Sequence, residues 1–157
     1  MTIDHDAVRL ATPADEDGIM SMCRELHAEN GPHPLDEDKL RDMLRRAFDR
    51  QGGIVAVIGP PDDLRGCIYL SLEPVWFSQD YQLSELFNFV RPEHRRSGYA
   101  KALILYAKQC ADALGIDLMI GVLSNIRMEA KVRLYGRLVP KAGEFFVYRP
   151  PTYLASA

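Results

Sequence analysis

The sequence predicts a mixed α/β domain, and three observations support this prediction. Apolar residues recur at helical spacing in some segments and form short β-branched runs in others. Proline and glycine residues separate many of these segments. Near the middle of the chain, a helical pattern lies between two strand patterns, as in a strand-helix-strand crossover. We therefore expect one domain over residues 1–157.

Each element has a local signal in the sequence. Thr12 is typical of a helix N-cap and Pro13 of a first helical residue, whereas the prolines and the glycine of 30–34 cannot continue a helix. The β-branched run 54–58 is typical of a strand. The predicted elements are a strand over 7–11, helices over 13–29 and 36–48, strands over 54–58, 66–72 and 83–90, a helix over 98–114, a buried strand over 117–123, a helix over 126–138 and a last strand over 145–148.

The composition favours a soluble cytoplasmic protein. Hydrophobic residues make up 47% of the chain and charged residues 26%, which is close to the globular average and excludes a disordered or fibrous chain. No apolar run reaches the roughly 18–20 residues that span a bilayer, and no signal peptide is visible. The net charge of -3 offers no basic face for nucleic-acid phosphates. We therefore expect no membrane and no nucleic-acid partner.

The cysteines and histidines do not suggest a metal site. Cys23, Cys67 and Cys110 lie far apart among apolar neighbours, and the chain contains neither a CxxC pair nor an HxxxH spacing. We expect three reduced thiols and no bound metal.

Charge is unevenly distributed along the chain. Residues 12–38 hold eight acidic residues and one arginine, whereas residues 91–101 hold four basic residues and one glutamate. The first segment would attract a cation and the second an anion.

The basic segment coincides with a predicted helix start. A strand ends at Val90 and a helix opens near Gly98, where backbone N–H groups without partners can bind a phosphate. Gly98 has no side chain to hold an anion away, and Arg95, Arg96 and Lys101 add positive charge. The segment therefore predicts an anion site; an ordinary turn with solvated arginines is the alternative.

The same residues resemble the GNAT acyltransferases. The run 95–100, Arg-Arg-Ser-Gly-Tyr-Ala, fits the family signature R/Q-x-x-G-x-G/A, and the preceding run fits its aromatic-Val-x-Pro-x-x-Arg pattern. The resemblance implies a mainly antiparallel, twisted sheet flanked by helices, with acetyl-CoA as acetyl donor. The main chain of the strand would pair with the pantetheine arm and splay from the next strand at a bulge, while the turn would hold the pyrophosphate. The implied coenzyme-binding residues are Phe89, Val90, Arg95, Arg96, Ser97, Gly98, Tyr99 and Ala100.

A second run, Met128 to Tyr135, is similar to the family's N-x-x-A-x-x-L-Y pattern, whose tyrosine often protonates the leaving thiolate. The resemblance implies that Tyr135 is the catalytic acid; the alternative is an aromatic packed in the core. Met128 stands where the family usually has asparagine, and Val139-Pro140 replaces its Gly-Phe. Asn125 is a candidate for the missing amide. We expect the basic face of this helix, which includes Lys131, to be solvated.

Glu85 is the leading candidate for the catalytic base, because some family members carry a glutamate at a comparable offset. Glu73 is the rival candidate. A slip of one residue in strand register would turn Glu85 toward solvent instead.

The acceptor pocket should lie opposite the coenzyme, between the first two helices and the Trp76 loop. Acidic residues there would attract a cationic amine, and a solvated acidic face is the alternative. The residues of this predicted region are Glu25, His27, Glu29, His33, Trp76, Phe77 and Tyr81. The resemblance also implies a possible homodimer that pairs through the last strand.

Together these features predict an N-acetyltransferase that moves an acetyl group from acetyl-CoA directly to an amine in a ternary complex. A coenzyme A-binding module without catalysis, and a protein-interaction domain that uses the Trp76 loop, are the alternatives.

Overall fold

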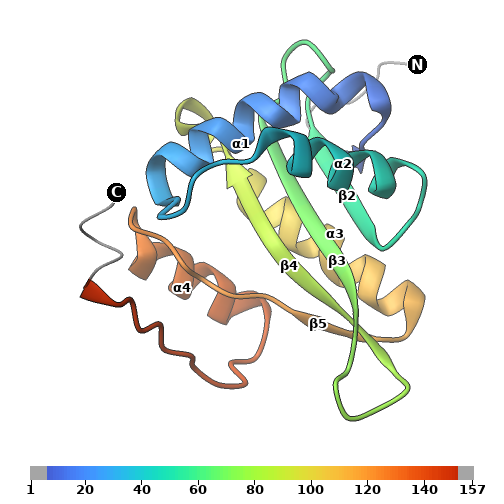
Figure 1. The fold of residues 1–157 in the computed structure, drawn as a ribbon, viewed down its shortest axis with the longest axis vertical. Helices are drawn as coiled ribbons and strands as arrows, with labels where there is room; N and C mark the ends of the chain where they lie inside the picture. Colours follow the sequence, from blue (N-terminus) through green and yellow to red (C-terminus); the bar gives the residue numbers. More distant parts are fainter. Residues whose placement is uncertain (1–6, 152–157) are drawn as a thin grey trace.

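The protein folds as a five-stranded sheet with helices on both faces (Figure 1). The structure is a computed structural model that describes residues 7–151. The elements are β1 (Val8–Leu10), a 3-10 turn (Pro13–Asp15), α1 (Glu16–Asn30), α2 (Glu37–Phe48), β2 (Gly53–Ile58), β3 (Gly66–Pro74), β4 (Tyr81–Val90), a second 3-10 turn (Pro92–His94), α3 (Tyr99–Leu114), β5 (Asp117–Met119) and α4 (Met128–Leu138).

The sheet is mixed and mainly antiparallel, as the resemblance implied. Its strands follow the chain in the order β1-β2-β3-β4-β5. The first four strands pair antiparallel, and β5 pairs parallel to β4 after the crossover through α3. Parallel neighbours need such a crossover connection.

Alternate residues of the central strands form two core layers. Val57 and Tyr69 point to the layer covered by α1 and α2, whereas Ile58 and Ile68 point to the layer under α3. The helices lie on the two faces accordingly (Figure 1). Because both faces are covered, β2 and the first half of β3 are almost wholly apolar.

Helix ends form where the sequence has capping residues. The carboxylate of Asp36 accepts the backbone N–H of Lys39 at 3.0 Å and starts α2. Gly98 and Gly115 flank α3 in the left-handed region, with φ of 84° and 65°. Glycine adopts this conformation at little cost.

A bulge interrupts the pairing of β3 with β4. Tyr69 lies opposite Phe87, but the next residue, Leu70, lies opposite Glu85, so Leu86 has no partner on β3. The extra residue reverses the alternation of side chains along β4. As a result Leu83 and Val90 both pack in the layer under α3, although seven positions separate them.

Two predicted strands are wrong. The strand expected over 117–123 ends at Met119, because β5 pairs only with Gln82–Ser84 before the two strands diverge. The strand expected over 145–148 does not form within the described residues, and its side chains are exposed, Phe146 by 91%. Residues with high strand propensity form a strand only where a neighbouring strand offers backbone hydrogen bonds. The homodimer through this segment stays a prediction.

Cys23 and Cys67 are buried, Cys110 is half-buried, and all three are free thiols. Within residues 7–151, no helix is long and apolar enough to cross a membrane. No group of three or more potential metal ligands is found in that part of the chain.

Candidate active site

Two cavities meet beside the open edge of β4. The larger, of about 420 Å³, lies between β4, the first two helices and the segment that follows β5. The smaller, of about 160 Å³, lies between the end of β4 and α4. Asn88, Lys131 and Tyr135 line both cavities. If one molecule occupied each cavity, the two molecules would therefore come closest to each other at these three side chains.

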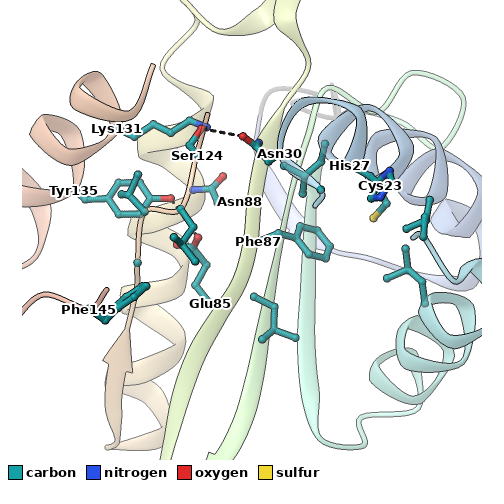
Figure 2. A pocket seen from close by; sticks show the side chains of 18 residues that line it. Cys23, His27, Asn30, Glu85, Phe87, Asn88, Ser124, Lys131, Tyr135 and Phe145 are labelled. Carbon is teal, nitrogen blue, oxygen red and sulfur yellow. Dashed lines mark hydrogen bonds between the residues drawn. The ribbon is translucent and has the colours of Figure 1, made fainter. Parts of the chain in front are cut away.

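Glu85 and Tyr135 face each other in the larger cavity (Figure 2). The Tyr135 hydroxyl donates to Glu85 Oε1 at 3.4 Å, and Glu85 Oε2 is buried with no partner among the described residues. Glu85 precedes the bulge at Leu86 and Asn88 follows it, and the extra residue lets both side chains face α4 (Figure 2). The structure thus brings together the two residues predicted as base and acid.

Burial shifts the pKa values of this pair. Loss of hydration raises the pKa of Glu85 from 4.5 to about 7, although Tyr135 and Lys131 oppose the shift. Burial, and then the nearby Glu85 carboxylate, raise the pKa of Tyr135 well above its ordinary value of 10. Near neutral pH, Glu85 can therefore take up or release a proton, while the hydroxyl of Tyr135 stays protonated.

Asn88 and Lys131 were not predicted as site residues. Both polar atoms of the Asn88 side chain are buried without a partner at standard hydrogen-bond geometry in the described part of the chain, but the amide lies close enough to the Tyr135 hydroxyl to oppose the rise in the pKa of Tyr135. Lys131 is half-buried and donates to Ser124 Oγ at 2.7 Å, so the prediction that it is solvated is wrong. Burial lowers the pKa of Lys131. Neither side chain had a motif that could have marked it.

The turn before α3 has the features of an anion site. A Cβ at Gly98 would meet nothing within 4 Å, so the space beside it is open. Ala102 N–H bonds back to Gly98, but the N–H groups of Gly98, Ala100 and Lys101 have no acceptor among the described residues. These N–H groups lie at the positive end of α3. Arg96, Ser97 and Gly98 are exposed there, and Tyr99 is half-buried.

The main chain of β4 is open beyond the β5 pairing. Arg91 N–H donates to Arg65 O on the β3 side, at 2.9 Å. Because backbone groups alternate along a strand, Val90 directs its N–H away from β3. Phe89, Val90, Arg95 and Ala100 all line the smaller cavity. These features fit a group that carries an extended polar arm and a terminal diphosphate.

The acidic and basic segments pair with each other. Arg95 donates to Glu29 Oε1 at 2.5 Å and to Val90 O at 3.1 Å, and its guanidinium lies 5.5 Å from the centre of the Phe89 ring. Arg91 donates to Glu25 Oε2 at 2.6 Å. These pairs join the turn before α3 to α1. The side chain of Arg95 therefore holds the turn in place rather than standing free.

The Trp76 loop does not belong to the site. Trp76 and Phe77 are 92% and 73% exposed, and Trp76, Phe77 and Tyr81 line neither cavity, because the β3–β4 turn lies at the far end of the sheet (Figure 1). His27 does line the larger cavity, and its Nε2 is 2.6 Å from His33 O. Phe145, from the last segment of the chain, also lines the larger cavity, on the side of Tyr135 (Figure 2).

Asn125 does not supply an amide to the reacting pair. Its side-chain amide donates to Glu29 O at 3.4 Å and its backbone N–H to Asn30 Oδ1 at 2.7 Å, so both bonds tie the segment after β5 to the end of α1. Glu73 lies on the far half of β3 and lines neither cavity, so it is not placed to act as the base.

Known proteins resemble this chain in sequence profile and in fold. The sequence profile of the Acetyltransferase (GNAT) family matches residues 20–138. A comparison with curated protein sequences finds no match.

Three solved structures share the fold at low identity. The integron cassette protein HFX_CASS3 from the Cole Harbour Salt Marsh metagenome superposes with a TM-score of 0.72 at 20% identity, covering 95% of each chain. A possible acetyltransferase from Clostridium difficile 630 gives 0.70 at 21% identity, covering 91% of this chain and 95% of its own. The aminoglycoside acetyltransferase meta-AAC0020 from an uncultured soil metagenomic sample gives 0.70 at 16% identity, covering 95% and 97%. The profile match covers most of the chain, and the chain therefore belongs to the GNAT acetyltransferase family.

Proposed function

We propose that this protein is an N-acetyltransferase that uses acetyl-CoA and transfers the acetyl group directly to an amine. The observation that supports the proposal most strongly is the Glu85–Tyr135 contact, at the wall where the two cavities meet. When bound, acetyl-CoA supplies an acetyl group activated as a thioester. The other cavity leaves room for the amine acceptor.

The turn before α3 and the open edge of β4 would hold the coenzyme. The free N–H groups of Gly98, Ala100 and Lys101 would bind the diphosphate, assisted by the positive end of the helix. The N–H of Val90 would bind a carbonyl oxygen of the extended arm or steady the oxyanion that develops during transfer. Arg95 would act through its bonds to Val90 and Glu29, which keep the turn and strand together.

Glu85 and Tyr135 would move the protons. Glu85 takes a proton from the acceptor amine, a role suited to a carboxylate whose pKa is about 7. The Tyr135 hydroxyl gives its proton to the departing sulfur. Since the two groups are in hydrogen-bond contact, the proton held by Glu85 can then return to Tyr135. Both residues end in their starting states, and the net result is one proton moved from amine to thiol.

Replacement of Tyr135 by phenylalanine tests this role. We expect the variant to bind coenzyme A as the unaltered protein does but to lose about 100-fold or more in kcat, because general acid catalysis commonly contributes that factor. Tyr106→Phe is the matched control, since Tyr106 lies on α3 and lines neither cavity. An unchanged kcat in Tyr135→Phe would remove this hydroxyl from the mechanism.

A further inference from the structure

The larger cavity has two chemically different ends. Figure 2 shows Glu85, Tyr135, Asn88 and Lys131 on the side of α4, whereas Phe87 points to the other side, toward α1. Around Phe87 the lining comes from α1, α2 and the segment between them. It is mainly apolar, with two polar side chains from α1, His27 and Asn30; its apolar members are Cys23, Leu26, Leu35 and Leu40. An amine held at Glu85 would therefore carry its substituent toward an apolar surface.

This apolar end has no carboxylate to receive a second cation. Among the described residues that line the cavity, Glu85 is the one acidic side chain, and it lies at the polar end. The nearby acids of α1, Glu25 and Glu29, do not line the cavity and form ion pairs with Arg91 and Arg95, although Glu29 Oε2 has no partner among the described residues. The expectation that the acidic segment attracts a cationic amine is therefore not supported by the geometry.

Lys131 lies at the polar end of the cavity and adds positive rather than negative charge to its wall. Its ammonium group is half-buried in the wall, bonds to the neutral hydroxyl of Ser124, and has no ion-pair partner in the described part of the chain. A second positive charge at the apolar end would find no carboxylate there and would lose its hydration against the leucines.

We propose that the acceptor is a primary amine carried on an apolar group, with no second cationic group. This inference rests on the proposed acetyl transfer and specifies its acceptor class. Polyamines and aminoglycosides are excluded, because their additional ammonium groups would lie in the leucine-lined end. That end binds the apolar group, and Glu85 receives the amine.

Hexylamine and 1,5-diaminopentane test the proposal, because they have the same number of heavy atoms and differ by a terminal methyl against a terminal ammonium. Binding of each amine is measured by NMR titration of the protein without coenzyme, followed by acetyl transfer with acetyl-CoA. We expect hexylamine to bind at least about 10-fold more tightly, since burial of an unpaired ammonium costs more than loss of one apolar contact. Equal or tighter binding of 1,5-diaminopentane, or no saturable binding of hexylamine, would overturn the proposal.

The Leu35→Glu variant should shift the preference toward 1,5-diaminopentane. Leu35 lies between α1 and α2 and is half-buried in the lining, so its replacement places a carboxylate at the apolar end without disrupting a helix or strand. Leu114→Glu is the matched control, since Leu114 is 53% exposed at the end of α3 and lines neither cavity. The affinity ratio should shift toward 1,5-diaminopentane by about 10-fold or more in Leu35→Glu alone. An unchanged ratio would contradict the proposed orientation.

The two readouts separate this inference from the proposed activity. If hexylamine binds preferentially but receives no acetyl group, the acetyl transfer is wrong and only the preference of the cavity for an apolar amine stands. If 1,5-diaminopentane or an aminoglycoside is acetylated faster than hexylamine, the acetyl transfer stands and the acceptor class is wrong.

Discussion

Replacement of Glu85 by glutamine should change how the stability of the protein depends on pH. The pKa of Glu85 rises from 4.5 to about 7 on folding, because burial disfavours its charged form. Each pKa unit corresponds to 1.36 kcal/mol, so the charged carboxylate costs the folded state at most about 3 kcal/mol. The cost is absent below pH 4.5, where the carboxyl is protonated in both states. It grows as the pH rises and is complete above about pH 7. Glutamine does not titrate and avoids this cost.

Urea unfolding at pH 4.5 and pH 8.5 measures this effect. Relative to the unaltered protein, Glu85→Gln should gain up to about 3 kcal/mol in free energy of unfolding between the two pH values. Glu73→Gln is the matched control, because it removes a strand glutamate that lies outside both cavities. If Glu85→Gln and Glu73→Gln show the same pH dependence, the carboxylate of Glu85 is not desolvated and the argument for its role as a base is refuted.

Two further substitutions test the surroundings of the site by urea unfolding. Asn88→Leu should lower the free energy of unfolding by about 1 kcal/mol, because the amide interacts with the buried Tyr135 hydroxyl and leucine cannot. An unchanged or higher stability would show that this interaction does not form. Arg95→Leu should cost about 3 kcal/mol, since it leaves the Glu29 carboxylate, 15% exposed, without its cation. The double variant with Glu29→Leu should recover most of that loss, and additive losses would show that the two side chains do not interact.

The turn before α3, where we propose that the coenzyme binds, could be predicted from the sequence. The turn before α3 depends on a strand end, a glycine and a helix start that are adjacent in the chain. Because these three features are local, the structure of the turn depends little on how distant parts of the chain pack. Tyr135 and Glu85 were also identified, although their contact could not be deduced, because it requires β4 and α4 to meet.

The features that were missed depend on tertiary structure. The resemblance implied a bulge at this strand but not its position, and Leu86 lies where two polar residues are followed by two apolar ones, which does not by itself locate an extra residue. Lys131 occupies a helix face that is solvated on an isolated helix and half-buried once α4 lies against β4. The segment over 145–148 has strand-forming residues, but β5 is too short to offer it a ladder. In each case the neighbouring element decides the outcome.

Binding of acetyl-CoA to Gly98→Ala and Gly115→Ala, measured by calorimetry, tests the central claim most directly. Both glycines have positive φ at an end of α3, and a Cβ at either would meet nothing within 4 Å. Each variant should therefore lose a similar stability, about 1 kcal/mol, through backbone strain alone. We predict that Gly98→Ala alone loses affinity, by about 10-fold or more, because its methyl group enters the space beside the free N–H groups. Equal affinities in the two variants would contradict a diphosphate site at the start of α3.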